Sequence, residues 1–302
     1  MRIVQMIHDA VLLLALTTSI FLAGCSSRVI VAQSTHSVVT TPSKSFPVPT
    51  NPTTNKTLDE LLLFFPAKYP EGDWSPEGLN FEDVSFQAKD GTQLHGWFCT
   101  CDAPRAIVLF MHGNGGNITH RSSRMKYLQK ELHVTTFIFD YRGYGRSEGT
   151  PSVEGILGDA RAAREVLAKR AGVDESHIVL MGESLGGAVA ANLAGELGAR
   201  GLVLENTFSS LKDTATHHYP QLAWLVPANK LDSVTSLAKY QGPLLQCHGD
   251  FDRTIPISLG RKLFDAGKGV KQFVTMPGND HNDVLSNEYN KMLNRWISSL
   301  PK

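Results

Sequence analysis

Short apolar runs alternate with helical patterns along most of the chain. Two early runs, Val84–Ala88 and Leu94–Cys99, alternate apolar and polar residues around Lys89-Asp90-Gly91, which predicts a β-hairpin. The later runs are almost wholly apolar and of strand length, as is typical of strands buried on both faces. These later runs are Ala106–Met111, Val134–Asp140, Ile178–Met181, Gly201–Glu205, Pro243–Cys247 and Gln272–Met276.

Stretches of helical character separate the predicted strands. They are Ser122–Leu132, Ser152–Ala171, Ala188–Ala194 and Val284–Leu300. Alternation of strands with helices predicts an α/β fold, in which helices cover both faces of a doubly wound, mostly parallel sheet of eight strands. Ser209–Gly242 has no strand pattern and is too long for a plain connection, so we expect a small helical cap there.

The N-terminus follows a different pattern. Arg2 precedes an apolar run, Ala10–Ala23, that is too short to span a bilayer and ends in Leu22-Ala23-Gly24-Cys25. This ending resembles the bacterial lipoprotein signal, and the resemblance implies that residues 1–24 are removed and that Cys25 receives lipid. An ordinary signal peptide or an uncleaved anchor stays open, because the segment before the apolar run has a single basic residue and also contains Asp9.

Residues 25–57 would then link the lipidated cysteine to a domain spanning residues 58–302. The linker is rich in Ser, Thr, Pro and Val without helical periodicity, which indicates a flexible tether. By the lipoprotein resemblance, Ser26 after the cysteine implies sorting to the outer membrane. We therefore expect a protein anchored in a bacterial cell envelope, facing the periplasm.

Composition narrows the class of protein. The chain has 302 residues, is 42% hydrophobic and carries no net charge, which indicates one large globular domain plus the N-terminal segments. A neutral chain without clustered Lys and Arg lacks the electrostatic footprint of nucleic-acid binding. No His or Cys spacing is typical of a metal site, and nothing implies a cofactor. The sequence does not indicate an oligomeric state.

The motif Gly182-Glu183-Ser184-Leu185-Gly186 stands between an apolar strand and an Ala-rich helix. A G-x-S-x-G sequence alone is a weak signal, but strand, sharp turn and helix are the context in which such a serine is a nucleophile. Flanking glycines are needed because a side chain at either position would collide with the neighbouring strand or helix. A serine hydroxyl also needs a base and an orienting carboxylate.

Candidates for both partners follow later predicted strands. His248-Gly-Asp-Phe-Asp252 offers two carboxylates, and Pro277-Gly-Asn-Asp-His281 offers a histidine. The order Ser, Asp, His is that of the α/β hydrolases. With His112-Gly-Asn-Gly-Gly116 and Asp140–Gly149, these motifs resemble the α/β-hydrolase superfamily over roughly residues 60–300, and most resemble its small-capped lipases, esterases, thioesterases and peptidases.

The resemblance implies roles for individual residues. Ser184 would be the nucleophile, His281 the base and Asp252 the acid, since the fifth residue of the family's His-Gly-x-x-Asp pattern is catalytic; Asp250 would then form a turn, and Asp280 would only be solvated. The backbone N–H groups of Asn114 and Leu185 would form the oxyanion hole.

We therefore expect a serine hydrolase that cleaves small or medium acyl esters or thioesters through an acyl-enzyme intermediate. An aminopeptidase-like serine peptidase and a non-catalytic binding module are the alternatives. Two apolar segments have either a packing role or a role in holding an acyl chain: Leu61–Phe65, and the apolar residues of the cap around Trp224.

Overall fold

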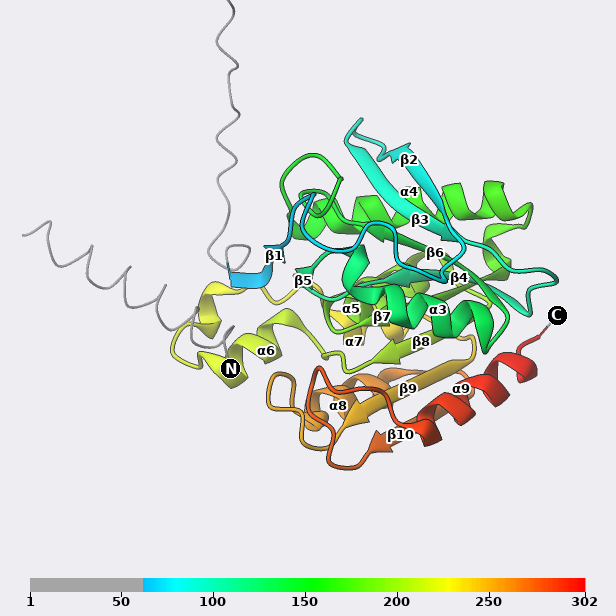
Figure 1. Ribbon diagram of the computed structural model, residues 1–302. Coiled ribbons are helices and arrows are strands. Elements are labelled where there is room, and N and C mark those ends of the chain that lie inside the picture. The colour runs from blue at the N-terminus through cyan, green and yellow to red at the C-terminus, as the bar shows by residue number, and fades with distance from the viewer. Residues whose placement is uncertain (1–61, 302) are drawn as a thin grey trace, which may run out of the picture. The chain divides into compact units, whose positions relative to one another are not determined.

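The computed structural model describes residues 62–301 and contains the expected sheet. Eight strands are ordered β10-β9-β8-β7-β4-β6-β3-β2 (Figure 1). The hairpin strand β3 runs antiparallel to both of its neighbours, whereas every other neighbouring pair is parallel. The strands are β2 (Glu82–Gln87), β3 (Gln93–Cys99), β4 (Ala106–Met111), β6 (Val134–Asp140), β7 (Ile178–Glu183), β8 (Gly201–Glu205), β9 (Leu244–Gly249) and β10 (Lys271–Met276).

Helices cover both faces of the sheet, which confirms the doubly wound prediction (Figure 1). Alternate residues of each central strand point to opposite faces, so Leu109 and Leu180 enter one apolar core while Phe110 and Met181 enter the other. The first core contains residues of α4, α5 and α8, and the second contains residues of α3 and α9. The helices are α3 (Ser122–Lys130), α4 (Val153–Ala171), α5 (Leu185–Leu197), α6 (Leu211–His218), α7 (Ser233–Leu237), α8 (Ile257–Ala266) and α9 (Asn287–Ser299), with short 3-10 turns η1 (Ile118–Arg121), η2 (Glu175–His177) and η3 (Ala223–Leu225).

Three local features differ from the sequence prediction. The helix α8 was not predicted, although its apolar Leu259 and Leu263 are four residues apart. The last helix begins three residues later than expected, because the Ser286 side chain caps it by accepting a hydrogen bond from the Tyr289 N–H. A small parallel sheet also joins β1 (Phe65–Pro66) to β5 (Gly115–Gly116).

The segment between β8 and β9 is helical, as expected for residues 209–242. Within it, α7 packs against α5 and α8, while the end of α6 contacts the loop after β9, where His218 Nε2 lies 2.7 Å from the Thr254 carbonyl. In the apolar segment Leu61–Phe65, the side chains of Leu63 and Phe64 are buried in the first core. A packing role therefore accounts for these two side chains.

Candidate active site

Ser184 occupies a strained turn between β7 and α5. Its φ and ψ angles are 51° and −120°, a region that side-chain-bearing residues rarely adopt. A Cβ added to Gly182 would lie 2.2 Å from the Gly186 carbonyl oxygen, and one added to Gly186 would lie 1.9 Å from that of Met111. The expectation that only glycine fits on either side of the serine is confirmed.

The structure brings the three side chains of the expected triad together. His281 Nε2 lies 3.0 Å from Ser184 Oγ, and His281 Nδ1 lies 2.7 Å from Asp252 Oδ2. These residues follow β7, β9 and β10, and the carboxyl ends of parallel strands meet at one edge of the sheet. The arrangement is that of a nucleophile, a base and an orienting carboxylate.

Asp252 is held as a carboxylate. Burial alone would raise its pKa, but hydrogen bonds from His248 and His281 outweigh this effect and lower the pKa to about 2. Its Oδ1 atom also accepts the backbone N–H groups of Thr254 and Ile255, at 2.9 and 2.7 Å. Because an ionised carboxylate can only accept, His281 donates from Nδ1, and in the neutral ring Nε2 is the unprotonated nitrogen that faces the serine hydroxyl.

Two residues around the triad make contacts that the sequence did not predict. Asp280 is more than a solvated loop residue, because its Oδ2 accepts from Arg253 Nε at 2.8 Å and its Oδ1 accepts from the His281 N–H at 2.8 Å. The Asp280 carboxylate thus joins the histidine loop to the loop that carries Asp252. On the other side, the Asn206 side chain donates to the His281 carbonyl at 3.0 Å and accepts from the Gly249 N–H at 3.1 Å.

His248 also contacts the acid of the triad. Its ring is fully buried, and Nε2 lies 2.8 Å from the Ile255 carbonyl and 3.3 Å from Asp252 Oδ2. Since a carbonyl oxygen can only accept, Nε2 carries the proton and faces both oxygens. The ring therefore supports the same carboxylate oxygen that His281 Nδ1 faces.

Leu185 follows the serine in the chain, and Asn114 follows Gly113, whose built Cβ would lie 3.5 Å from Ser184 Cβ. Leu185 is the first residue of α5, so its N–H has no partner within the helix. Asn114 is fixed by its side chain, which donates to the Leu63 carbonyl at 3.0 Å, and by its carbonyl, which accepts from the Phe65 N–H at 3.0 Å and the Tyr144 hydroxyl at 2.7 Å. None of these bonds uses the Asn114 N–H, so none of them prevents this group from donating to a substrate oxygen.

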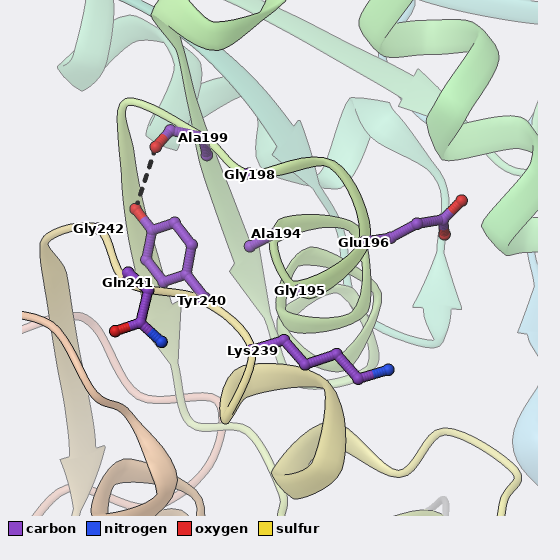
Figure 2. Close-up of a pocket in the computed structure, with 9 residues that line it drawn as sticks. All are labelled: Ala194, Gly195, Glu196, Gly198, Ala199, Lys239, Tyr240, Gln241 and Gly242. Atoms are coloured by element: carbon purple, nitrogen blue, oxygen red, sulfur yellow. Dashed lines mark hydrogen bonds between the residues drawn. The ribbon is translucent and has the colours of Figure 1, made fainter.

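A hollow of about 400 Å³ lies away from the triad, between residues 194–199 and 239–242 (Figure 2). It is at the carboxyl end of α5, whereas Ser184 precedes the other end, and a 13-residue helix is about 20 Å long. Figure 2 shows the Tyr240 hydroxyl bonded to the Ala199 carbonyl, at 3.3 Å. This hollow is not part of the triad's surroundings.

Residues 62–301 contain neither a group of metal ligands nor a membrane-spanning helix. No group of three or more His, Cys, Asp or Glu side chains in this range could hold a metal ion. No helix in the same range is both long and apolar enough to cross a bilayer. The predicted lipidation residue, Cys25, lies outside the described residues.

The sheet order, the strained serine turn and the three side chains above it define an α/β hydrolase. Comparison with known proteins places the chain in that superfamily. It is 37% identical over 240 residues to the uncharacterized protein YfhR of Salmonella typhi, covering 73% of this chain and 82% of the relative. It is 34% identical to the α/β hydrolase domain-containing protein WAV2 of Arabidopsis thaliana, covering 75% and 82%. The chain belongs to the α/β-hydrolase superfamily.

Two further comparisons agree with this assignment. Residues 102–234 match the family model described as serine aminopeptidase, S33. Among solved structures, an esterase of Pyrococcus furiosus superposes with a TM-score of 0.67 at 16% identity, covering 79% of this chain and 97% of the esterase. At this identity the likeness shows the fold alone.

Proposed function

We propose that this chain is a serine hydrolase that cleaves acyl esters or thioesters through an acyl-enzyme intermediate. The observation that carries the proposal is the continuous chain of contacts from Ser184 Oγ to His281 at 3.0 Å and from His281 to Asp252 at 2.7 Å. Backbone strain at Ser184 supports it, because strained residues that the fold maintains cluster at active sites.

In the proposed reaction, Ser184 Oγ attacks the acyl carbonyl carbon while His281 Nε2 takes the hydroxyl proton. The Asp252 carboxylate stabilises the imidazolium that forms. The carbonyl oxygen becomes an oxyanion, which the N–H groups of Asn114 and Leu185 would bind. The C–O or C–S bond then breaks, and His281 returns the proton to the leaving alcohol or thiol. Water, activated by the same histidine, hydrolyses the acyl-enzyme.

A fluorophosphonate probe and a substrate panel test this proposal. The probe should form a covalent adduct on the tryptic peptide containing Ser184 and on no other serine. The panel contains p-nitrophenyl esters of several chain lengths, acyl thioesters and aminoacyl nitroanilides. We expect turnover of the esters or thioesters, and an enzyme that neither reacts with the probe nor turns over any substrate would support the non-catalytic alternative.

A serine peptidase is the second candidate function. It is favoured by one observation, the match of residues 102–234 to the family model named serine aminopeptidase. The Ser-His-Asp geometry serves amide and ester hydrolysis alike, so it does not separate the two. In the panel, a higher kcat/KM for aminoacyl nitroanilides than for every ester and thioester would favour the peptidase.

We further propose that lipid on Cys25 anchors the enzyme to the bacterial envelope. The proposal is supported by the apolar run Ala10–Ala23, which ends in Leu22-Ala23-Gly24-Cys25 and resembles the bacterial lipoprotein signal. An anchored enzyme would act on substrates released from, or held in, the same membrane.

Changing Cys25→Ser tests the anchor. We expect the wild-type protein to start at a triacylated Cys25 and to sediment with membranes, whereas the variant keeps an unmodified N-terminal segment because the thiol that accepts the lipid is gone. Mass spectrometry of the N-terminal peptide and membrane fractionation measure both properties. Ser26→Thr serves as the control and should leave lipidation unchanged. A wild-type mature N-terminus elsewhere, without acyl groups, would contradict the proposal.

The acyl preference is a separate prediction. Trp224 is 75% exposed, so its side chain does not pack on the sheet and is available to an acyl chain. If it covers the chain of a bound ester, Trp224→Ala should raise KM for medium-chain esters several-fold and leave acetyl esters nearly unchanged, because the lost contacts lie along the chain. Val270→Ala, at an 80% exposed residue next to β10, is the control. Equal KM changes for both chain lengths would leave the preference unsupported.

A further inference from the structure

Glu183, the residue before the nucleophile, is bonded to the loop that carries Asn114. Its Oε1 atom accepts the backbone N–H of Gly113 at 3.1 Å. The same oxygen accepts from the Arg121 guanidinium, with Nε and Nη2 each at 2.6 Å. Arg121 Nη1 in turn donates to the Gly115 carbonyl at 2.9 Å. The ion pair therefore holds the residue before Asn114 and the residue after it.

The loop is held close to the serine at this point. A Cβ built on Gly113 would lie 3.5 Å from Ser184 Cβ, 3.4 Å from Glu183 Oε1 and 3.2 Å from Arg121 Nη2. Glu183 is the last residue of β7 and is joined covalently to Ser184, so its carboxylate moves with the turn that carries the nucleophile. The bonds to Gly113 and Arg121 thus fix the Asn114 loop relative to the serine.

The charges of Glu183 and Arg121 favour a role in holding the Asn114 loop over a role in binding substrate. Burial would raise the pKa of Glu183, but the charge of Arg121 and the bond from Gly113 outweigh it and hold the pKa below its usual value. Arg121 directs Nε, Nη1 and Nη2 to partners within the protein, and its side chain is only 16% exposed. The guanidinium therefore donates to Glu183 and to the loop, and it does not face an anionic substrate.

We propose that Glu183 and Arg121 are positioning residues that hold the Asn114 N–H at the distance from Ser184 that oxyanion binding requires. The inference rests on the proposed serine-hydrolase function and adds the element that aligns its oxyanion hole. Donors in such a hole act only when they are preorganised, and a misplacement of about 1 Å can lower a rate about 100-fold. Neither residue takes part in proton transfer.

The chain offers a matched control pair. Arg161 on α4 binds Glu196 on α5, with Arg161 Nε 2.8 Å from Glu196 Oε1. Both side chains are exposed, at 40% and 44%, and the pair lies at the end of α5 that is remote from Ser184. An exposed pair of this kind contributes little to stability, so removing it should affect neither the turn nor the loop.

The experiment measures kcat and KM for one p-nitrophenyl ester in Glu183→Ala, Glu183→Gln, Arg121→Ala, the double alanine variant and Glu196→Ala. We expect kcat to fall about 100-fold in Glu183→Ala with KM within about twofold, because the oxyanion forms only in the transition state. Glu183→Gln keeps an oxygen that can accept from Gly113 and should recover most of the loss. The double variant should lose no more than the worse single variant, and Glu196→Ala should match wild type.

Hydrogen exchange gives a second readout that does not depend on activity. In wild type the Gly113 N–H is bonded to Glu183, so exchange in the peptide of residues 112–117 should be faster in Glu183→Ala and Arg121→Ala and unchanged in Glu196→Ala. Unchanged exchange, or kcat within threefold of wild type in Glu183→Ala, would overturn the proposal. A raised KM at constant kcat would also overturn it, since the pair would then act in substrate binding.

The same set of proteins separates this inference from the function on which it rests. Ser184→Ala provides the blank for each assay. If the positioning proposal fails alone, turnover still disappears in Ser184→Ala, whereas the Glu183 and Arg121 variants behave like the Glu196→Ala control and wild type. If the serine-hydrolase proposal fails, Ser184→Ala keeps the activity of wild type.

Discussion

Replacing Ser184 with alanine should lower kcat/KM at least 1000-fold, because it removes the atom that would attack the acyl carbon. The residual rate would come from the oxyanion hole and from substrate binding alone. Steady-state hydrolysis of the best ester or thioester of the panel measures the loss. Labelling by the fluorophosphonate probe should disappear in parallel.

The fold should persist in Ser184→Ala. Two of the bonds that hold the turn use backbone atoms of Ser184, since its N–H donates to the Glu205 carbonyl at 2.9 Å and its carbonyl accepts from Thr207 Oγ1 at 2.7 Å. Alanine keeps both, so Tm should change by no more than about 2 °C. A folded Ser184→Ala protein with wild-type activity would refute the proposed nucleophile.

Replacing Asp252 with asparagine should lower kcat about 10⁴-fold, an effect of the size that wrong-tautomer variants show in serine proteases. Asp252 Oδ2 faces N–H groups of both His281 and His248, and Oδ1 faces two backbone N–H groups. The asparagine amide would place its NH₂ group, which is a donor, where one of the two carboxylate oxygens accepted hydrogen bonds. The NH₂ group would then face other donors. The ring of His281 then turns or protonates its other nitrogen, and Nε2 no longer accepts the serine proton.

Asp250→Asn is the matched control, two residues away in the same loop. Asp250 Oδ1 accepts the Gly278 N–H at 2.7 Å, and an asparagine oxygen can accept the same bond. We expect kcat within about threefold of wild type for this variant. Measuring kcat and KM of both variants at one pH decides the assignment, and greater damage from Asp250→Asn would transfer the acid role to Asp250.

The sequence alone predicted the sheet and the order of its strands along the chain. Strands such as Ile178–Met181 and Ala106–Met111 are apolar on both faces, and only a sheet covered by helices on both sides buries such segments. Motifs after three of these strands, interpreted through the resemblance to the α/β hydrolases, identified the three residues that the structure brings together. Ser184, Asp252 and His281 each directly follow a strand or its turn, so the parallel sheet places them at one edge.

Tertiary structure decided the contacts between distant segments. Glu183 is 62 residues from Arg121 and 70 from Gly113, and no periodicity links them. Two other contacts between segments distant in the sequence also depend on the tertiary structure. They are the pairing of Phe65 with Gly115 and the bond from Arg253 to Asp280. A local pattern reports which face of an element is buried, because burial depends on neighbours along the element. The partner of a polar side chain depends instead on how the loops pack, and only the folded chain determines that arrangement.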